Sequence, residues 1–128
     1  MSNNLELAAA FFTASGAGDA DGLTAFCAPD FVGTQNGGPD MNLKSLVWLA
    51  TTVKKALPDF RYENAVRSET STGFVEEHDV CATLPDGKAL RIPICVVADV
   101  SDGKVTAMRE YFDSAAAAPL MAALSGQA

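Results

Sequence analysis

Two carboxylates near the end of this chain, Asp79 and Glu110, could act together as a general acid/base pair. Each lies in a run of alternating apolar residues next to an Asp-Gly turn: residues 74–84 precede Asp86-Gly87, and residues 104–113 follow Asp102-Gly103. Asp-Gly between such runs is a strong hairpin signal, because both residues tolerate positive φ. The pattern therefore predicts a three-stranded antiparallel meander. A water or small substrate held between two carboxylates of unequal pKa is an acid/base device.

The middle strand of this meander, residues 89–100, defines which face is buried. Its even positions are all apolar, so they are expected to face the interior. They are Leu90, Ile92, Ile94, Val96 and Ala98. If Asp86-Gly87 is a two-residue turn, Asp79 lies opposite Ile94 and Glu77 lies opposite Val96, on that buried face. Burying a carboxylate is costly unless it has partners or a function.

The second hairpin allows two registers. A three-residue loop at 101–103 pairs Ile94 with Glu110 and places Asp79, Ile94 and Glu110 in one row. A two-residue loop shifts the pairing by one residue and buries Arg109 instead. We favour the first register, because it buries the apolar side chains of the last strand, Met108 and Phe112.

The residues from Asp79 to Lys88, followed by those from Asp102 to Asp113, resemble the limonene epoxide hydrolase and SnoaL-like polyketide cyclase group of the nuclear transport factor two-like superfamily. The resemblance implies an α+β fold over residues 1–128 as a single SnoaL-like domain. In this fold a cone-shaped, curved antiparallel sheet packs against N-terminal helices around an apolar cavity. It also implies that Glu110 is a catalytic acid/base.

The same resemblance suggests further site residues. Asp79 takes the place of the Asp in the Arg-x-Asp pair of limonene epoxide hydrolase, and Asn36 resembles the Asn that holds the water. The Arg position of that pair is occupied by Glu77, and the Tyr position falls near Thr34. The His that SnoaL-type cyclases use beside their acid falls at Val96. Asp79, Glu110 and Asn36 are thus the candidate catalytic residues, and the expected substrate-binding wall comprises Thr34, Trp48, Glu77, Ile94, Val96, Met108 and Phe112.

The first 70 residues are expected to form the other wall of the cavity. Apolar residues at helical spacing predict a first helix that ends at Gly16, a short second helix that ends at Pro29, and a third helix that starts after Asn42. Strands are expected at 31–35 and 59–67, and a short terminal helix is expected to start at Pro119. His78 is the only histidine, and it is expected on the surface because it lies on the opposite face from Asp79.

Composition limits the partners. The chain has 128 residues, 48% of them hydrophobic, which is enough for one core of ordinary size without metal or disulfides. Three cysteines without metal spacing indicate free thiols and a cytoplasmic protein. A net charge of −7 disfavours nucleic acid and anionic membranes. A small apolar ligand is expected, with no cofactor and no metal. A homodimer is expected through the outer sheet face, which would carry Pro93, Cys95, Val97, Val105, Ala107 and Tyr111.

Three function classes remain open at this point. The first is an enzyme that opens an epoxide, by hydrolysis or cyclisation. The second is a cyclase or isomerase that removes a proton next to a carbonyl group, and the third is a non-catalytic module that binds an apolar ligand or dimerises. If Asp79 and Glu110 share an apolar wall, at least one of them should have a raised pKa and the pair should share a proton.

Overall fold

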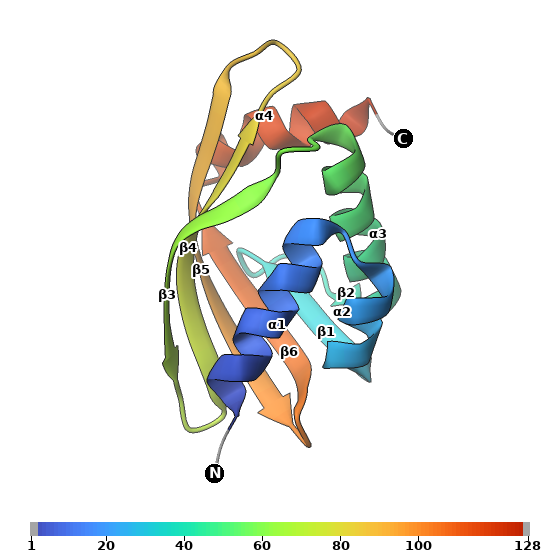
Figure 1. Ribbon diagram of the computed structural model, residues 1–128, viewed down its shortest axis with the longest axis vertical. Helices are drawn as coiled ribbons and strands as arrows, with labels where there is room; N and C mark the ends of the chain where they lie inside the picture. The colour runs from blue at the N-terminus through green and yellow to red at the C-terminus, as the bar shows by residue number, and fades with distance from the viewer. Residues whose placement is uncertain (1–2, 127–128) are drawn as a thin grey trace.

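The computed structural model describes residues 3–126, and it confirms the predicted α+β class. One curved sheet partly encloses the helices, which lie on its concave side (Figure 1). Helix α4 packs against β5 and α3. The elements, in chain order, are α1 (Asn4–Ala17), α2 (Ala20–Phe26), β1 (Cys27–Gln35), β2 (Met41–Asn42), α3 (Leu43–Ala56), β3 (Arg61–Glu69), β4 (Gly73–Thr83), β5 (Ala89–Ser101), β6 (Lys104–Phe112) and α4 (Ser114–Ser125).

The six strands lie in the order β2-β1-β6-β5-β4-β3. The meander β3-β4-β5-β6 is antiparallel, whereas β1 joins its edge by pairing parallel to β6. This pairing places β1, from the first third of the chain, beside β6, the last strand. Gln35, at the end of β1, lies directly beside Glu110 of β6.

Local sequence signals explain most helix boundaries. The side chain of Asp19 caps α2 by accepting from the Gly22 amide, and that of Asn42 caps α3 by accepting from the Ser45 amide. Helix α4 starts at Ser114, so the prediction of a start at Pro119 was wrong. The Asp113 side chain caps this helix, and four consecutive alanines, which have the highest helix propensity, extend it before the proline.

The first hairpin has a five-residue loop rather than a two-residue turn. The Leu84 amide donates to the Lys88 carbonyl across this loop at 2.8 Å. The β4–β5 pairing is therefore shifted by one residue from the prediction, so that Glu76 lies opposite Val96 and His78 opposite Ile94. A shift of one residue exchanges the two faces of a strand.

The second hairpin has the two-residue turn of one predicted register and the inward-facing Glu110 of the other. Asp102 and Gly103 form a two-residue turn with φ of 52° and 72°. A bulge at Thr106 then restores the alternation, so Glu110 faces inward but lies opposite Val96 rather than Ile94. Val105 precedes the bulge and is fully buried, so its expected place on the outer face was wrong.

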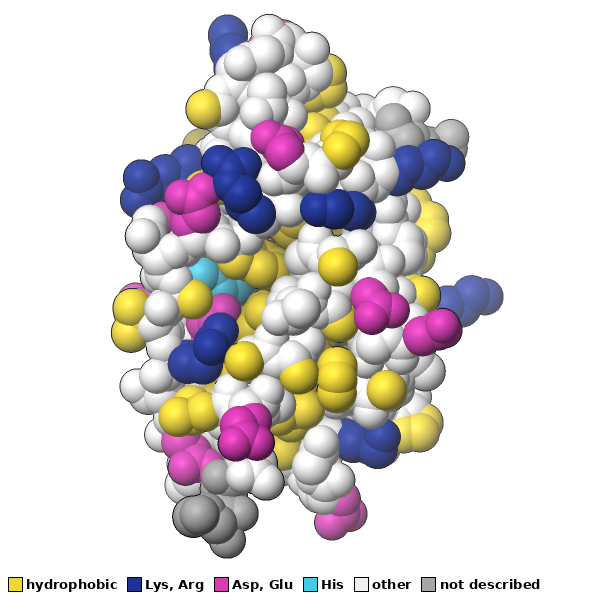
Figure 2. Space-filling view, viewed as in Figure 1, with side chains coloured by type: hydrophobic (Ala, Val, Ile, Leu, Met, Phe, Trp, Pro, Cys, Tyr) yellow, Lys and Arg dark blue, Asp and Glu magenta, His cyan; other side chains and the backbone are white. Residues whose placement is uncertain are grey.

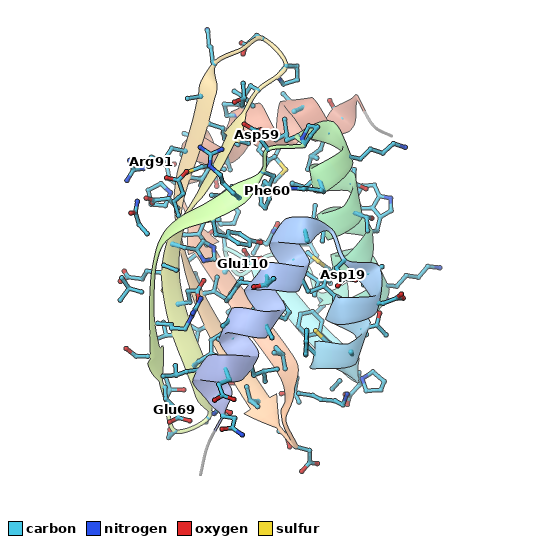
Figure 3. The ribbon with its side chains drawn as sticks, viewed as in Figure 1. Asp19, Asp59, Phe60, Glu69, Arg91 and Glu110 are labelled. Carbon is cyan, nitrogen blue, oxygen red and sulfur yellow. The ribbon has the colours of Figure 1, made fainter. Side chains whose placement is uncertain are left out.

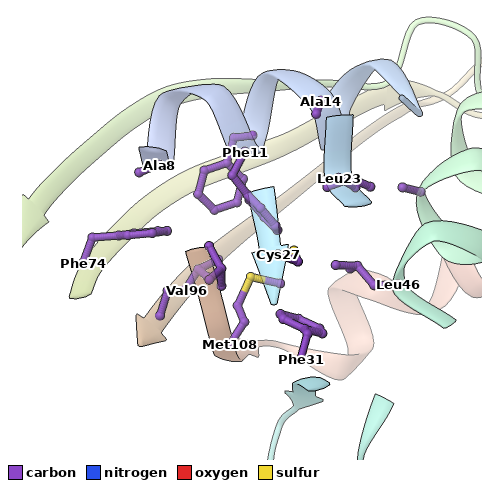
Figure 4. Packing of buried hydrophobic residues seen from close by; sticks show 14 residues of the cluster. Ala8, Phe11, Ala14, Leu23, Cys27, Phe31, Leu46, Phe74, Val96 and Met108 are labelled. Atoms are coloured by element: carbon purple, nitrogen blue, oxygen red, sulfur yellow. The ribbon is translucent and has the colours of Figure 1, made fainter. Parts of the chain in front are cut away.

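The core forms where α1, α2 and α3 cover the concave face of the sheet. Figure 4 shows one cluster of buried side chains from these helices and four strands. A second cluster fills the other end of the concave face, between α3, α4 and the β4–β5 hairpin. Polar groups of the inner face lie between these two apolar regions, and both clusters contact Tyr62 and Ile94.

Gly73, the first residue of β4, is predicted to be intolerant of any side chain. A Cβ at this position would overlap the carbonyl group of Ala98 on β5. Gly73→Ala should therefore lower the free energy of unfolding by about 2–3 kcal/mol or more, as overpacking does elsewhere. Gly103→Ala is the control, because its Cβ would meet no atom within 4 Å and only the positive φ is unfavourable, at about 1–2 kcal/mol. Urea unfolding of both variants measures the two losses in free energy of unfolding, and Gly73→Ala should show the larger one. Equal losses in the two variants would contradict the close packing of β4 on β5.

Candidate active site

Five strands contribute to a single row of side chains across the concave face. Arg67 of β3 pairs with Glu76 of β4, which pairs with Val96 of β5, then with Glu110 of β6, and finally with Gln35 of β1. Four of the five residues are polar or charged, although the face is otherwise apolar. Two carboxyl groups thus stand two strands apart, roughly 10 Å at the backbone.

Glu76 is completely buried and has two hydrogen-bond donors. Arg67 Nε lies 2.6 Å from Glu76 Oε1, and His78 Nδ1 lies 2.6 Å from Glu76 Oε2. The His78 side chain is only 2% exposed, whereas that of Arg67 is 30% exposed. A buried carboxylate needs such compensation, because removal from water disfavours its charge.

The imidazole of His78 is held in position from two sides. Its ring packs 4.4 Å from that of Tyr62 and 5.0 Å from that of Phe12, measured between centroids. Because a carboxylate can only accept, the contact with Glu76 places the ring proton on Nδ1. No residue between 3 and 126 forms a hydrogen bond with Nε2, and the ring lines a cavity. Figure 2 shows the only histidine recessed in the surface, beside apolar side chains and a neighbouring acidic side chain.

Tyr62 provides a neutral wall beside this histidine. Its hydroxyl group is 2.8 Å from Ser15 Oγ on α1. Burial raises the pKa of Tyr62 well above its ordinary value of 10.0, against the opposing effect of the Ser15 hydrogen bond. The phenol therefore stays protonated over the physiological range.

Glu110 is a half-buried carboxyl group that lines the cavity. Burial raises the pKa of Glu110 above its ordinary value, while the Gln35 hydrogen bond and the nearby His78 oppose this shift. In Figure 3, Glu110 and Phe60 lie between the sheet and the helices. A carboxylic acid of raised pKa can donate a hydrogen bond near neutral pH.

The cavity enclosed by these groups has a volume of about 90 Å³. One water occupies about 10–15 Å³ on this measure, so the space holds several waters or a small part of a larger substrate. Apolar groups predominate in its lining, and among residues 3–126 no lysine or arginine lines it. The lining residues are Phe11, Phe12 and Ser15 of α1; Gln35; Leu46, Leu49, Ala50 and Val53 of α3; Phe60 and Tyr62; His78 and Val80; Ile92 and Ile94; Met108, Glu110 and Phe112; and Ala117, Leu120, Met121 and Leu124 of α4.

Several residues predicted for the cavity wall do lie there, namely Glu110, Ile94, Met108 and Phe112. Val96 points to the same face but is fully buried in the core between Glu76 and Glu110.

Asp79 and Glu77 lie on the outer face of the sheet, so their expected place beside Glu110 was wrong. The shifted hairpin register is the cause. Asp79 accepts hydrogen bonds from Asn64 Nδ2 at 2.9 Å and from an Arg91 guanidinium nitrogen at 2.7 Å. These partners, Asn64 first, lower the pKa of Asp79, whereas that of Glu110 is raised. The two acids therefore share no proton.

Asn36, Thr34 and Trp48 also lie outside the cavity lining. Asn36 adopts a φ of 53°, and its side chain accepts from the Phe112 amide at 2.9 Å, which ties the end of β1 to the end of β6. Thr34 is half-buried, and Trp48 is 57% exposed on the outside of α3. The neighbouring residue Gln35 reaches the cavity instead.

Glu76, His78 and Tyr62 are the site residues that the sequence analysis missed. The even positions of β4 carry the signal that could have revealed the first two. Buried Phe74, Val80 and Ala82 flank them at a period of two, and that pattern alone places Glu76 and His78 inside. The assumed turn length overrode this pattern.

Within residues 3–126, no group of three or more His, Cys, Asp or Glu side chains is placed to hold a metal ion. None of the helices in the same range is both long and apolar enough to span a bilayer. The cysteines at 27, 81 and 95 are unpaired, and burial raises the pKa of the Cys27 thiol to about 11.

The sequence and the fold were compared with known proteins. A family described as the SnoaL-like domain matches residues 8–108. Among curated proteins no sequence matches.

Solved structures with similar folds share little sequence with this chain. IdmH of Streptomyces antibioticus, a candidate polyketide cyclase, is 16% identical with a TM-score of 0.81, over 97% of this chain and 99% of its own. AclR of Streptomyces galilaeus, a candidate hydroxylase, is 20% identical with a TM-score of 0.78, over 98% of each chain. TerC, co-crystallised with polyporic acid, is 19% identical with a TM-score of 0.76, over 97% of this chain and 99% of its own. These likenesses show a common fold.

The raised pKa of Glu110 predicts a pH-dependent gain in stability on Glu110→Gln. Between its ordinary value of 4.5 and its raised value, the folded protein keeps a proton that the unfolded chain releases. Wild-type stability from this group therefore falls as the pH rises through that window. We expect the melting temperature of Glu110→Gln to exceed that of wild type at pH 8, and the difference to shrink towards pH 4.

Glu77→Gln, on the outer face, is the matched control for this experiment. It should show no such trend in thermal melts between pH 4 and pH 8. A higher melting temperature for wild type than for Glu110→Gln at pH 8 would contradict this prediction, because it would show that the fold stabilises the ionised carboxylate.

Proposed function

This chain belongs to the SnoaL-like domain family, and on that basis we propose that it is an acid/base enzyme acting next to a carbonyl group of a small, largely apolar substrate. One observation carries the proposal: a buried imidazole oriented by a buried carboxylate shares an apolar cavity with a second carboxyl group of raised pKa. Titratable groups whose environments differ in this way are typical of acid/base sites.

His78 is the proposed base. Its Nδ1 donates to Glu76, which leaves the lone pair of Nε2 for the cavity. A carboxylate that fixes the tautomer of a catalytic histidine has the same role in hydrolase triads. In the first step, Nε2 takes a proton from the carbon next to the carbonyl, and the electron pair of that C–H bond moves into the enolate.

Glu110 is the proposed acid. In its protonated form it donates a hydrogen bond to the carbonyl oxygen, which gains negative charge as the enolate forms. Gln35 holds this carboxyl group from the neighbouring strand. In isomerisation, His78 then returns the proton to a different carbon of a conjugated enolate. In cyclisation, the enolate carbon instead attacks a carbonyl carbon of the same molecule, the π electrons of that C=O bond move to its oxygen, and this oxygen takes the proton from His78.

Two structural neighbours agree with this class of reaction. IdmH is described as a candidate polyketide cyclase, and polyketides are rich in carbonyl groups; TerC has been crystallised with polyporic acid. Opening of an epoxide by Asp79 and Glu110 would need both carboxyl groups on one wall, and Asp79 lies on the other face of the sheet. The cyclase or isomerase reaction is therefore favoured.

A homodimer in the cytoplasm also forms part of the proposal. The outer sheet face exposes Val66 and Tyr111, which are 63% and 48% accessible, beside Pro93 and Cys95. Apolar groups gathered on a small protein often mark an interface. Three unpaired cysteines support a reducing compartment.

Glu76→Gln and His78→Asn should abolish proton abstraction. The assay follows deuterium uptake from D₂O at the acidic carbon of small cyclic diketones and enones by mass spectrometry, because this exchange needs only the base and the carbonyl partner. We expect each variant to lose a factor of about 10²–10⁴ in exchange rate, the range for a base or its orienting group.

The matched control is Glu77→Gln, one residue from Glu76 but on the outer face, and it should keep the wild-type rate. If no carbonyl compound exchanges faster with wild type than with His78→Asn, while ligands still bind the cavity, the protein is a binding module.

The dimer predicts a sedimentation mass of twice 13.3 kDa at micromolar concentration. Val66→Glu should shift that mass towards one chain, because it introduces charge into the proposed interface. Trp48→Glu serves as the control, since Trp48 is also exposed but lies on α3, away from the outer sheet face. A mass of 13.3 kDa for wild type would disprove the interface.

A further inference from the structure

Arg67 contacts Glu76 from the side opposite His78, and a bulge in β3 makes this contact possible. Before the bulge, Tyr62 pairs with Val80 and faces the cavity. Strict alternation from Tyr62 would turn residue 67 outward. One extra residue between Glu63 and Val66 changes the register, so Arg67 pairs with Glu76 on the inner face.

Asn64 fixes the bulge. Its backbone has a φ of 58°, an uncommon value for a residue other than glycine. Its side-chain amide donates to Asp79 Oδ2 at 2.9 Å on the outer face, where Arg91 holds the same carboxylate oxygen. The outer-face group of Asn64, Asp79 and Arg91 thus supports the inward direction of Arg67.

The positive charge of Arg67 determines whether Glu76 needs a second positive charge from His78. A fully buried carboxylate needs a positive partner, and the guanidinium supplies one through a 2.6 Å contact. The imidazole can then remain neutral while its Nδ1–H donates to Glu76. Without Arg67, the imidazole would be the only cation that residues 3–126 place within reach of Glu76, so the pair would hold a proton on Nε2 as well. A protonated Nε2 has no lone pair with which to accept a proton.

Other ionisable groups near His78 cannot replace Arg67. Tyr62 stacks on the ring and stays a neutral phenol, and Glu110 is a further acid. Asp79, next to His78 in the chain, is also an acid, and it lies on the outer face, where Arg91 pairs with it. Helices α1, α3 and α4 contribute no titratable side chain to the cavity lining.

We propose that Arg67 is a positioning residue that acts through Glu76 to keep His78 neutral, with its proton on Nδ1 and a free lone pair on Nε2. This role rests on the proposed function of His78 as a base, yet the state of the ring can be measured without any substrate. Since the chain contains one histidine, its ring signals need no assignment.

The experiment uses the full chain labelled with ¹⁵N-histidine and follows both ring nitrogens by NMR between pH 5 and pH 9. In wild type at pH 7, we expect the signature of a neutral ring protonated on Nδ1. In Arg67→Met, the signature of the doubly protonated ring should persist to a pH at least one unit higher. Arg67→Lys keeps a positive charge and should restore the wild-type profile.

Arg109→Met is the matched control. It removes an arginine that also pairs with a carboxylate of a neighbouring strand, Asp99 of β5, but away from Glu76 and from the bulge of β3, and should leave the ring profile close to that of wild type. If Arg67→Met does not fold, Arg67→Gln gives the same test, because it retains a neutral donor for Glu76. The acidic limb of the deuterium-exchange rate should move to higher pH in the same variants.

The outcomes separate the two proposals. An unchanged ring profile in folded Arg67→Met or Arg67→Gln would overturn the role of Arg67, whatever the activity. A changed profile together with no exchange activity in wild type would support the role of Arg67 in setting the ring state and refute the reaction proposed for His78.

Discussion

The complete burial of the Glu76 carboxylate is the constraint around which the inner face is arranged. A charge withdrawn from water in this way must be compensated by donors, and in this chain Arg67 and His78 provide them from two directions. The donors in turn need support: the imidazole rests on Tyr62 and Phe12, and Tyr62 is anchored to α1 through Ser15. A single buried acid therefore links the edge strand, the middle of the sheet and the covering helix.

The sequence predicted the architecture well because its signals are local or strongly periodic. Asp-Gly turns, apolar alternation in β5 and polar caps before α2 and α3 lead to an α+β meander with N-terminal helices. The inward direction of Glu110 also follows from alternation. Which residues of β4 face it depended on the length of one loop, and the five-residue loop at 84–88 exchanged Asp79 and Glu77 for His78 and Glu76. Bulges at Thr106 and between Glu63 and Val66 change register without a clear sequence signal, since tertiary pairing places them.

The two faces of the sheet place their carboxyl groups in different electrostatic environments. On the outer face, Asp79 has a lowered pKa, because Asn64 and Arg91 stabilise its anion. On the inner face, the carboxyl group of Glu110 has a raised pKa, because it lies away from water. Residue type alone does not distinguish these acids; the side of the sheet does.

The bulge in β3 shows how the polar groups of such a cavity can change through strand register rather than through residue identity. Pairing the same residues of β3 without the bulge would leave every side chain chemically intact but would turn Arg67 to the outside and Val66 to the inside. The edge position of β3 makes this change easy to accommodate, since only β4 pairs with it. The gain or loss of a bulge at an edge strand thereby provides this architecture with a route to new pocket chemistry that comparisons of aligned residues would overlook.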